Sequence, residues 1–559
     1  MSAERPGGAW PYLPASVDIY DTTLRDGSQQ EGLSLSVDDK LRVAEQLDHL
    51  GVAYIEGGWP GANPKDDEFF RRAPKELRLG TAQLVAFGST RRAGGSAESD
   101  STLAQLLEAD TETVCIVAKA WDWHVTEALR TSLDEARAMV QDSVAFLIRA
   151  GRRVFLDAEH FFDGYRANPD FALSILDVAL EAGSEMVVLC DTNGGSLPFW
   201  AEEVSAAVRE RVGDRFGVHF HNDSGCAVAN SVMAVRQGAR QVQGCCNGYG
   251  ERTGNADLVT VIGNLSLKMG VRTIPPERLE RLTAVAHHVA EIVNLPPNPQ
   301  QPYVGSAAFA HKAGLHASGL ARAKGAYEHV NPEAVGNGTR FVVSELAGRS
   351  TISLKAQELG IDLDSKAVGE VLAHLKDLEH AGYHFEAADA SLELLLRGAT
   401  GWRQDYFRLE SFRVVTERRE RRTEESGEPE VEMVTEATVK VHVGKERILA
   451  VAEGNGPVHA LDCALRKAVE PYFDSLRRIR LTDFRVRVLD SAAGTAATTR
   501  VLIDSSDGER TWSTIGVSDN IIEASWQALA DSIVYGLLLA GARAAAASDS
   551  KEKSQRGTA

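Results

Sequence analysis

Between residue 16 and residue 268, short apolar stretches alternate with longer segments in which hydrophobic residues recur at helical spacing. The short stretches are rich in Val, Ile, Phe and Cys and predict buried strands, whereas the longer segments predict amphipathic helices. Strands are predicted at residues 16–22, 51–57, 79–87, 112–118, 152–158, 185–191, 215–220 and 239–246. Helical periods lie between them, for example at 38–50, 133–150 and 170–183.

Eight strand–helix units within about 250 residues are typical of a (β/α)8 barrel, whose active site lies at the carboxyl ends of the strands. Polar candidates occur at those ends, namely Asp26 after the first strand, Glu159 after the fifth, Thr192 after the sixth, and His219 and His221 at the end of the seventh. A doubly wound open sheet would instead gather its polar strand ends around one switch point. We therefore expect an α/β fold with a closed TIM barrel.

The pattern changes after the barrel. Residues 273–305 are rich in proline and predict a helix with a linker, and residues 332–400 predict small helices. Residues 405–541 contain two strand-rich units, each with a helix, at 453–468 and 516–540. This internal repeat predicts a pseudo-symmetric α+β domain. The expected organisation is a catalytic barrel at 1–272, a linker and helical subdomain at 273–404, a regulatory or dimerisation domain at 405–543 and a disordered tail at 544–559.

Composition narrows the class of protein. Sixty basic against seventy-nine acidic side chains give a net charge of −19, which argues against binding to nucleic acid. No apolar run approaches the ~20 residues that cross a bilayer, and the amino end lacks the layout of a signal peptide. The six cysteines are scattered, mostly in apolar stretches, which favours reduced thiols in a cytoplasmic protein over a disulfide framework.

Two polar segments, far apart in the chain, together predict a metal site. In Arg25–Gln29 a cation, an anion and an amide are crowded into one turn at the end of a strand. His219 and His221 stand at positions i and i+2, so they point to the same face of their strand. Taken alone, the first segment is better explained as a strand exit with a surface ion pair, and the two histidines have the alternative of a solvated strand face. Two histidines with Asp26 are a common ligand set for a divalent ion that keeps open positions for substrate.

Two further segments carry candidate residues. The glycine-rich turn Asn247-Gly-Tyr-Gly-Glu-Arg-Thr-Gly-Asn255 follows the eighth predicted strand. Its glycines let the backbone approach a ligand closely, although a plain loop before the last barrel helix has the same composition. The second segment, Ala310–Gly319, holds His311 and His316, which taken alone are explained as polar residues on a helix.

Three of these motifs together resemble a known family. Leu24–Gln29, Gly217–Gly225 and Gly250–Asn255 are similar to the signatures of the α-isopropylmalate synthase, homocitrate synthase and citramalate synthase group, and they occur in the same order. The resemblance extends over nearly the whole chain. It implies a metal-dependent acyltransferase on a (β/α)8 barrel, followed by a regulatory domain.

Finer details resemble the long-form citramalate synthase branch of that group. They lie in Glu56–Asp66, Ala158–Tyr165 and Val343–Ser350, whereas isopropylmalate synthases usually carry a more apolar turn after the second strand. One departure is Ser318, which stands where the group usually has an aspartate. The implied reaction joins acetyl-CoA and pyruvate and hydrolyses the thioester, which gives (R)-citramalate for isoleucine biosynthesis. The alternatives are a 2-isopropylmalate synthase of leucine biosynthesis, a lyase or aldolase on the same barrel, and a barrel-derived binding protein without turnover.

The resemblance also implies roles for the candidate side chains. Asp26, His219 and His221 would hold the ion, with Asn255 as a further ligand. Zinc, manganese and magnesium all tolerate this ligand set. Arg25 would stabilise negative charge that develops on oxygen.

Acid–base chemistry and substrate contacts are implied for a second set of residues. Glu159 would remove the proton from the acetyl methyl group. His316 would assist the base or activate the hydrolytic water, and it would come from a neighbouring subunit of a homodimer. Thr192 would bind the carboxylate of the oxo acid, and Gln29 and Tyr327 are further candidate substrate contacts.

The repeated domain implies feedback regulation, with isoleucine favoured over leucine as the effector. Gly454–Pro457 and Gly516–Asp519 lead the two predicted helices, and the free N–H groups of a helix start suit an amino acid's carboxylate. The expected effector contacts are Gly454, Gly456, Gly516 and Asp519. A purely structural dimerisation domain would explain the same pattern.

Overall fold

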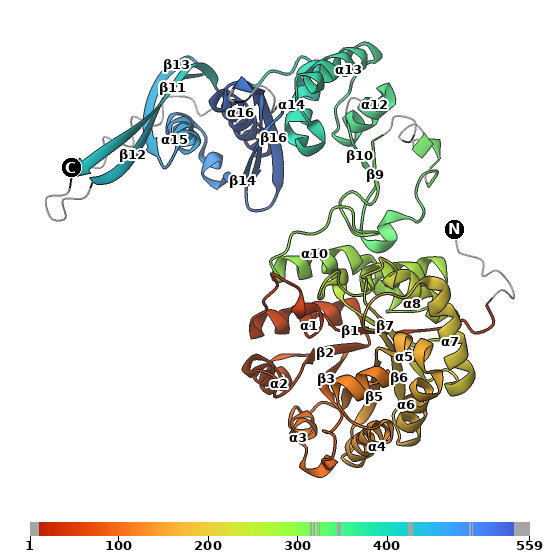
Figure 1. Cartoon of the computed structure of the whole chain (residues 1–559). Helices are drawn as coiled ribbons and strands as arrows, with labels where there is room; N and C mark the ends of the chain where they lie inside the picture. Colours follow the sequence, from red (N-terminus) through yellow and green to blue (C-terminus); the bar gives the residue numbers. More distant parts are fainter. Residues whose placement is uncertain are drawn as a thin grey trace. The chain divides into compact units, whose positions relative to one another are not determined.

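The computed structural model describes residues 10–312, 316, 319–320, 322–323, 325–343, 348–422, 429–490, 494 and 496–541. The expected tail at 544–559 and Ser318 lie outside the described residues. The chain divides into two compact units (Figure 1). We call Met1–Phe309 with Glu328–Thr339 the barrel unit, and Ala310–Tyr327 with Arg340–Ala559 the carboxy-terminal unit.

The barrel unit contains a closed parallel barrel whose eight strands follow the order of the sequence. The strands are β1 (Asp18–Asp21), β2 (Tyr54–Gly58), β3 (Gln83–Ser89), β4 (Thr113–Lys119), β5 (Arg153–Glu159), β6 (Met186–Asp191), β7 (Phe216–Phe220) and β8 (Gln241–Gly244). β8 pairs with β1 and closes the barrel. Each predicted strand overlaps one of these, so the predicted TIM barrel is confirmed.

Helices surround the strands (Figure 1). They are α1 (Val37–Leu50), α2 (Pro64–Glu76), α3 (Ser101–Glu108), α4 (Leu133–Arg149), α5 (Phe161–Ala167), α6 (Pro169–Glu181), α7 (Pro198–Val212), α8 (Ala227–Arg236), α9 (Leu258–Gly263) and α10 (Leu282–Ile292). Local signals set their ends: a capping box of Ser36 and Asp39 starts α1, and Gly51 ends it in the left-handed conformation at φ 96°. None of the helices among the described residues combines the length and apolar character of a membrane span.

The interior of the barrel is layered along the strands. An aromatic layer contains Tyr20, Tyr54 and Phe155, with the last two rings packed edge to face at 5.1 Å. Two residues further along their strands, and therefore on the same face, Glu56 and Asp157 form part of a buried polar layer. The aromatic layer thus fills the barrel interior below the polar strand ends.

Residues 273–309 lie in the barrel unit, although the sequence placed them in a separate linker subdomain. α10 packs against α1, and the amide of Asn247 donates to the carbonyl of Ala286 at 2.8 Å. The segment Glu328–Thr339 also belongs to this unit, where the hydroxyl of Thr283 donates to the carbonyl of Val335 at 2.7 Å.

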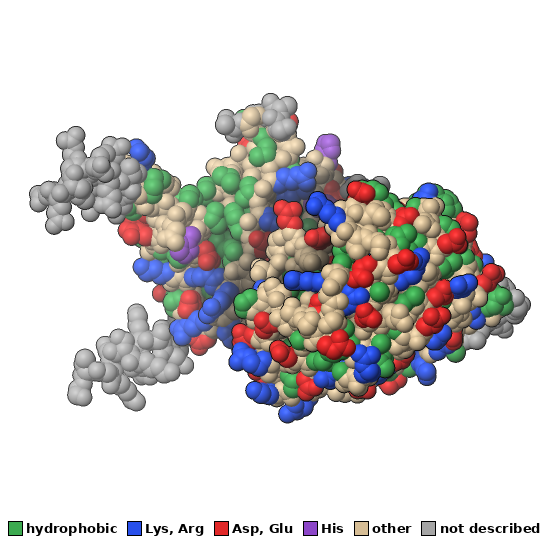
Figure 2. Space-filling view, turned by 60° about the horizontal axis from the view of Figure 1, so that its bottom comes forward, with side chains coloured by type: hydrophobic (Ala, Val, Ile, Leu, Met, Phe, Trp, Pro, Cys, Tyr) green, Lys and Arg blue, Asp and Glu red, His purple; other side chains and the backbone are tan. Residues whose placement is uncertain are grey.

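On the face shown in Figure 2, acidic and basic side chains are interspersed.

The carboxy-terminal unit contains the predicted repeat. β11 (Arg408–Arg422), β12 (Pro429–Val443) and β13 (Glu446–Gly454) form one antiparallel sheet with α15 (Pro457–Val469). β14 (Arg480–Val488), β15 (Thr499–Ser506) and β16 (Thr511–Ser518) form the second with α16 (Ile521–Leu539). The preceding elements are the short strands β9 (Ala310–His311) and β10 (Arg340–Phe341) and the helices α12 (Arg349–Glu358), α13 (Ser365–His380) and α14 (Asp389–Ala399). The two halves confirm the expected pseudo-symmetric α+β architecture.

The glycines of the repeat lie where strand and helix touch. Gly454 ends β13, and a Cβ there would stand 2.4 Å from the backbone nitrogen of Ala460. Gly516 lies within β16, where a Cβ would stand 2.0 Å from the carbonyl of Ala524. The prediction that Gly516 is in the turn before the helix was wrong, because β16 continues to Ser518 and Asn520 caps α16.

Candidate metal centre and active site

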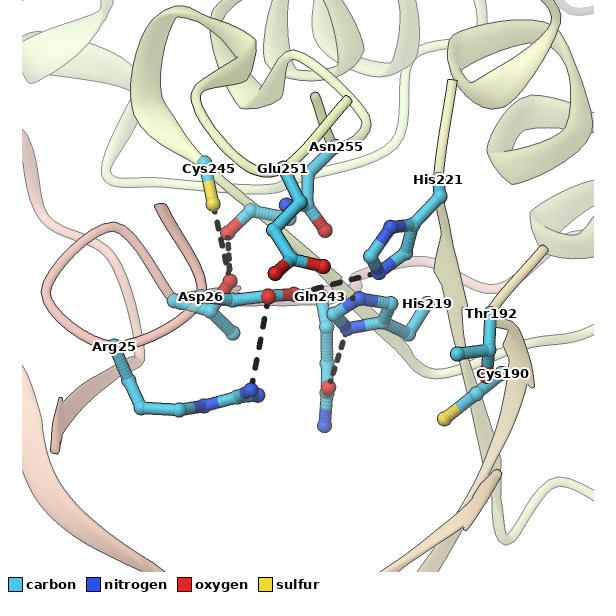
Figure 3. A network of polar contacts seen from close by, with 12 residues as sticks. Arg25, Asp26, Cys190, Thr192, His219, His221, Gln243, Cys245, Glu251 and Asn255 are labelled. Carbon is cyan, nitrogen blue, oxygen red and sulfur yellow. Dashed lines mark hydrogen bonds and ion pairs between the residues drawn. The ribbon is translucent and has the colours of Figure 1, made fainter. Parts of the chain in front are cut away.

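Asp26, His219 and His221 meet at the carboxyl end of the barrel. Asp26 Oδ2 lies 3.2 Å from His219 Nε2 and 3.4 Å from His221 Nε2. The turn after β1 supplies the carboxylate, whereas β7 and the residue after it supply the two rings (Figure 3). All three side chains are buried. The structure therefore brings together the three ligands that the sequence predicted.

The spacing and chemistry of these atoms fit a divalent ion. Two ligands bound to one ion at about 2.1 Å lie roughly 3.0–3.4 Å apart, which is the separation seen between the carboxylate and each ring. Asn255 Oδ1 is buried and has no hydrogen-bond partner among the described residues, while its amide nitrogen donates to the carbonyl of Tyr249 at 3.0 Å. A buried oxygen without a donor is unfavourable unless something else binds it. Asn255 forms an isolated antiparallel β-bridge with His221, which places it next to the site. It is thus a suitable fourth ligand.

Arg25 is held from three sides beside this cluster. Its Nε donates to Glu56 Oε1 at 2.6 Å, its guanidinium lies 3.9 Å from the ring centre of Phe87, and its Nη1 lies 3.7 Å from Asp26 Oδ1. The hydroxyl of Tyr20 fixes the other oxygen of Glu56 at 2.6 Å. Glu56 was not assigned a role from the sequence. An acidic residue inside an apolar strand is the signal that points to it, because a buried carboxylate needs a partner.

The charged forms of Arg25 and Asp26 are both strongly stabilised. Burial alone would lower the pKa of Arg25, but Glu56 and Asp26 raise it above its ordinary value. Burial would likewise raise the pKa of Asp26, but Arg25 and the two histidines hold it well below the usual range. Arg25 is therefore a fixed cation, and Asp26 is an anion that is ready to bind a metal.

A second group of polar residues lies at the ends of β4, β5 and β6. Lys119 and Glu159 are register partners, and their side chains form an ion pair in which each is about one quarter exposed, at 26% and 24%. His160 adopts a left-handed conformation at φ 56°, and its backbone N–H donates to Thr192 Oγ1 at 3.0 Å. Non-glycine residues in this conformation cluster at functional sites. The left-handed conformation of His160 therefore holds Glu159 and Thr192 at the carboxyl end of the barrel.

Arg252, in the glycine-rich turn after β8, contacts the candidate metal ligands from their outer side. It pairs with Asp223 at 2.7 and 2.9 Å and donates to the carbonyl of Thr192 at 2.9 Å. Its Nη2 also lies 3.0 Å from His221 Nδ1. Arginine only donates, so this contact places the ring proton of neutral His221 on Nε2. Metal ligation through Nε2 therefore requires Arg252 to turn away from His221 while it keeps Asp223.

The motif Glu56–Asp66 forms a rigid turn beside the site. The buried ammonium of Lys40 pairs with Asp66 and donates to the carbonyl of Gly57 at 3.1 Å. Asp66 in turn accepts from the backbone N–H of Trp59 at 3.0 Å. The Trp59 ring packs edge to face on Phe87, the ring that carries Arg25, at 5.3 Å. Gln29 lines a cavity of about 690 Å³ next to this turn, together with Arg25 and Trp59.

His316 and Tyr327 belong to the carboxy-terminal unit. Their rings stack at a centroid distance of 4.2 Å, and His311 packs against His316 at 6.1 Å. The structure thus brings these two predicted residues together.

Comparison with known families agrees with this geometry. Residues 16–289 match the HMGL-like family, residues 303–382 the homocitrate synthase post-HMGL domain-like family, and residues 386–537 the LeuA allosteric (dimerisation) domain. The closed barrel and these matches thus describe an HMGL-like barrel followed by a LeuA-type domain, and the barrel carries a candidate Asp-His-His metal site.

Curated relatives narrow the class further. The chain is 53% identical over 532 residues to the (R)-citramalate synthase of Streptomyces coelicolor, which covers 95% of this chain and 98% of that protein. It is 51% identical over 529 residues to that of Aquifex aeolicus, with 94% and 98% covered, and 52% identical over 534 residues to that of Synechocystis sp., with 94% and 96% covered. The chain belongs to the (R)-citramalate synthase family.

Proposed function

We propose that this protein condenses acetyl-CoA with pyruvate and water to give (R)-citramalate and CoA. The reaction is an acyl transfer in which the acyl group becomes an alkyl group. The observation that carries the proposal is near full-length similarity to (R)-citramalate synthases, at 53% identity with 95% of this chain covered. The buried ligand set of Asp26, His219 and His221 beside Arg25 supports it, because such a site suits an oxo acid.

Asp26, His219, His221 and Asn255 would hold a divalent ion, which would supply Lewis acidity at the keto group of pyruvate. Arg25, which Glu56 holds in place, stabilises the negative charge that develops on the keto oxygen. A cation that is fixed beforehand does not have to reorganise during the reaction. These side chains therefore prepare the acceptor for attack.

The acetyl donor needs a base. Glu159 removes a proton from the methyl group of acetyl-CoA, and the carbon then attacks the keto carbon of pyruvate. Lys119 fixes the orientation of Glu159 through their ion pair. Thr192 accepts from the backbone of His160, so its own hydroxyl hydrogen can donate to the pyruvate carboxylate. His316, supplied by the neighbouring subunit of the proposed homodimer, assists the base Glu159 or activates the water that hydrolyses the thioester.

Release of CoA tests this function directly. The full-length protein with a divalent ion and acetyl-CoA should release CoA when pyruvate is added, and only a background amount without an oxo acid. The branched acceptor 2-oxoisovalerate should have a lower kcat/KM, because the motifs around Trp59 and Phe161 resemble those of pyruvate-using relatives. The difference need not be large, since an apolar pocket resolves each methylene by only about 1–3 kcal/mol. Comparable kcat/KM values for both acceptors would assign the protein to 2-isopropylmalate synthesis. Cleavage of citramalyl substrates without condensation would instead indicate a lyase.

The carboxy-terminal unit supports a proposal for regulation. We propose a homodimer whose repeated domain binds isoleucine, and the match to the LeuA allosteric (dimerisation) domain supports it. The start of α15 suits the effector's carboxylate: Gly456 is its N-cap without a side chain, and Pro457 is its first residue. The start of α16 is less suitable, because Asn520 already accepts from the backbone of Ile522 and Glu523. We therefore favour the turn from Gly454 to Gly456 over Gly516 and Asp519.

Gly456→Asp in the full-length chain tests this assignment. A Cβ at Gly456 meets no heavy atom within 4 Å, and its φ of −178° suits any residue. The new carboxylate should cap α15 and stabilise the fold slightly, but it should repel the carboxylate of isoleucine. We expect a normal basal rate of CoA release with loss of inhibition by isoleucine, whereas Gly456→Ala should stay sensitive. Wild-type protein that is indifferent to both isoleucine and leucine would leave only a dimerisation role.

A further inference from the structure

A chain of buried hydrogen bonds lies beneath His219, outside the chemistry described above. Gln243 Oε1 lies 3.0 Å from His219 Nδ1 (Figure 3). Gln243 Nε2 donates to Asp157 Oδ1 at 3.0 Å. The thiol of Cys115 donates to the same oxygen at 3.2 Å. All four residues are at most 4% exposed. In a site shielded from solvent, each of these bonds constrains its neighbour.

The surroundings of Gln243 decide which way its amide faces. Two oxygens lie on the side of its nitrogen, Asp157 Oδ1 at 3.0 Å and Gln241 Oε1 at 3.4 Å. The reversed amide would place the carbonyl oxygen against both of them, so the nitrogen belongs on that side. The amide oxygen then faces His219. Because an amide oxygen only accepts, the facing Nδ1 atom must carry the ring proton.

The consequence for His219 concerns its other nitrogen. When a metal is bound, a neutral ring with its proton on Nδ1 would offer it the free electron pair of Nε2, the atom that faces Asp26 at 3.2 Å. This is the form that binds a metal. His221 lacks such support, because its Nδ1 faces Arg252, which is a donor. Of the two rings, only His219 is therefore held in the ligand form by its hydrogen-bond partner.

We propose that Gln243, anchored by Asp157, is a positioning residue that sets the tautomer of His219 for metal binding. β7 and β8 make this possible, because His219 and Gln243 are direct register partners. Hydrogen-bond partners behind metal-bound histidines fix the tautomer and the ring orientation in this way, and their loss typically costs about 10–100-fold in affinity. The inference rests on the metal site of the proposed function, but it makes a separate prediction.

Gln243→Met removes the acceptor and keeps the length of the side chain. We expect the affinity for Zn²⁺ and Mn²⁺ to fall by about 10–100-fold, measured by chelator competition on the full-length protein without substrate. Gln83→Met is the matched control, because Gln83 also lies on a barrel strand, β3, and its side chain contacts Thr113 and Arg153 rather than the Gln243 hydrogen bonds. Its affinity should stay near that of the wild type. Equal affinities of wild type and folded Gln243→Met would overturn the inference.

A double variant separates the effect on the tautomer from general damage to the barrel interior. Asp157→Asn with Gln243→Glu exchanges the carboxylate and the amide between the two positions. The carboxylate at 243 still accepts from His219 Nδ1, and the amide at 157 donates to it. We expect metal affinity equal to or higher than that of the wild type. A folded double variant that binds as weakly as Gln243→Met would refute the proposal, whereas a wild type that binds neither ion would refute the metal site itself.

Discussion

Glu159→Gln should reduce turnover by about 10²–10⁴-fold, the contribution expected of a general base. The amide keeps the shape of the side chain and can still accept from Lys119, so the position should be preserved. It cannot take a proton from the acetyl methyl group. The direct measurement is exchange of the methyl hydrogens of acetyl-CoA in deuterated water, followed together with CoA release.

Both rates should fall together in Glu159→Gln, while the affinities for metal and pyruvate stay unchanged. Glu98→Gln is a suitable control, because Glu98 has a 66% exposed side chain that pairs with Arg149 on the surface. Methyl exchange that continues at the wild-type rate in Glu159→Gln would move the role of the base to His316. That residue lies in the carboxy-terminal unit and can be tested in the same way.

Replacement of any of the three metal ligands by alanine should abolish both bound metal and activity. Of the three substitutions, Asp26→Ala should also disturb the neighbouring side chains most, because this carboxylate contacts both histidines and Arg25. The fold should survive, since the three side chains lie at strand ends and not in the aromatic layer. Metal content per chain, determined by elemental analysis, measures the loss, and the melting temperature reports the fold.

An exposed histidine provides the control for these variants. His288→Ala, on the solvent face of α10, should keep the full metal content and activity. Wild-type metal stoichiometry in all three ligand variants would show that the assignment of the site is wrong. Loss of metal in only one or two of them would instead identify which atoms hold the ion.

The sequence was sufficient to predict the barrel and part of its candidate site. Strands buried on both faces read as continuous apolar runs, and a polar residue at the end of such a run is conspicuous. For this reason Asp26, Glu159 and Thr192 could be assigned to strand ends. His219 and His221 could be paired because their spacing alone places both on one face.

The partners of these residues could not be predicted, because they depend on the register between strands. Lys119 meets Glu159, and Gln243 meets His219, only through the alignment of β4 with β5 and of β7 with β8. Nothing in the local pattern of either strand encodes that alignment. Gly516 shows a related limit: its sequence fits a turn, but strand pairing extends β16 past it to Ser518.

The proposed metal ligands lie on both sides of the place where the barrel closes. Asp26 follows β1, His219 lies in β7, and between them the ring is completed by the pairing of β8 with β1. During synthesis the carboxylate emerges long before the histidines, so the growing chain has no complete site until its last strand docks. An ion present at 100 times its Kd then adds about 2.7 kcal/mol to the free energy of unfolding. A bound ion would therefore link β1 to β7 across the pairing of β8 with β1. When metal is withheld, the barrel should open first between its first and last strands.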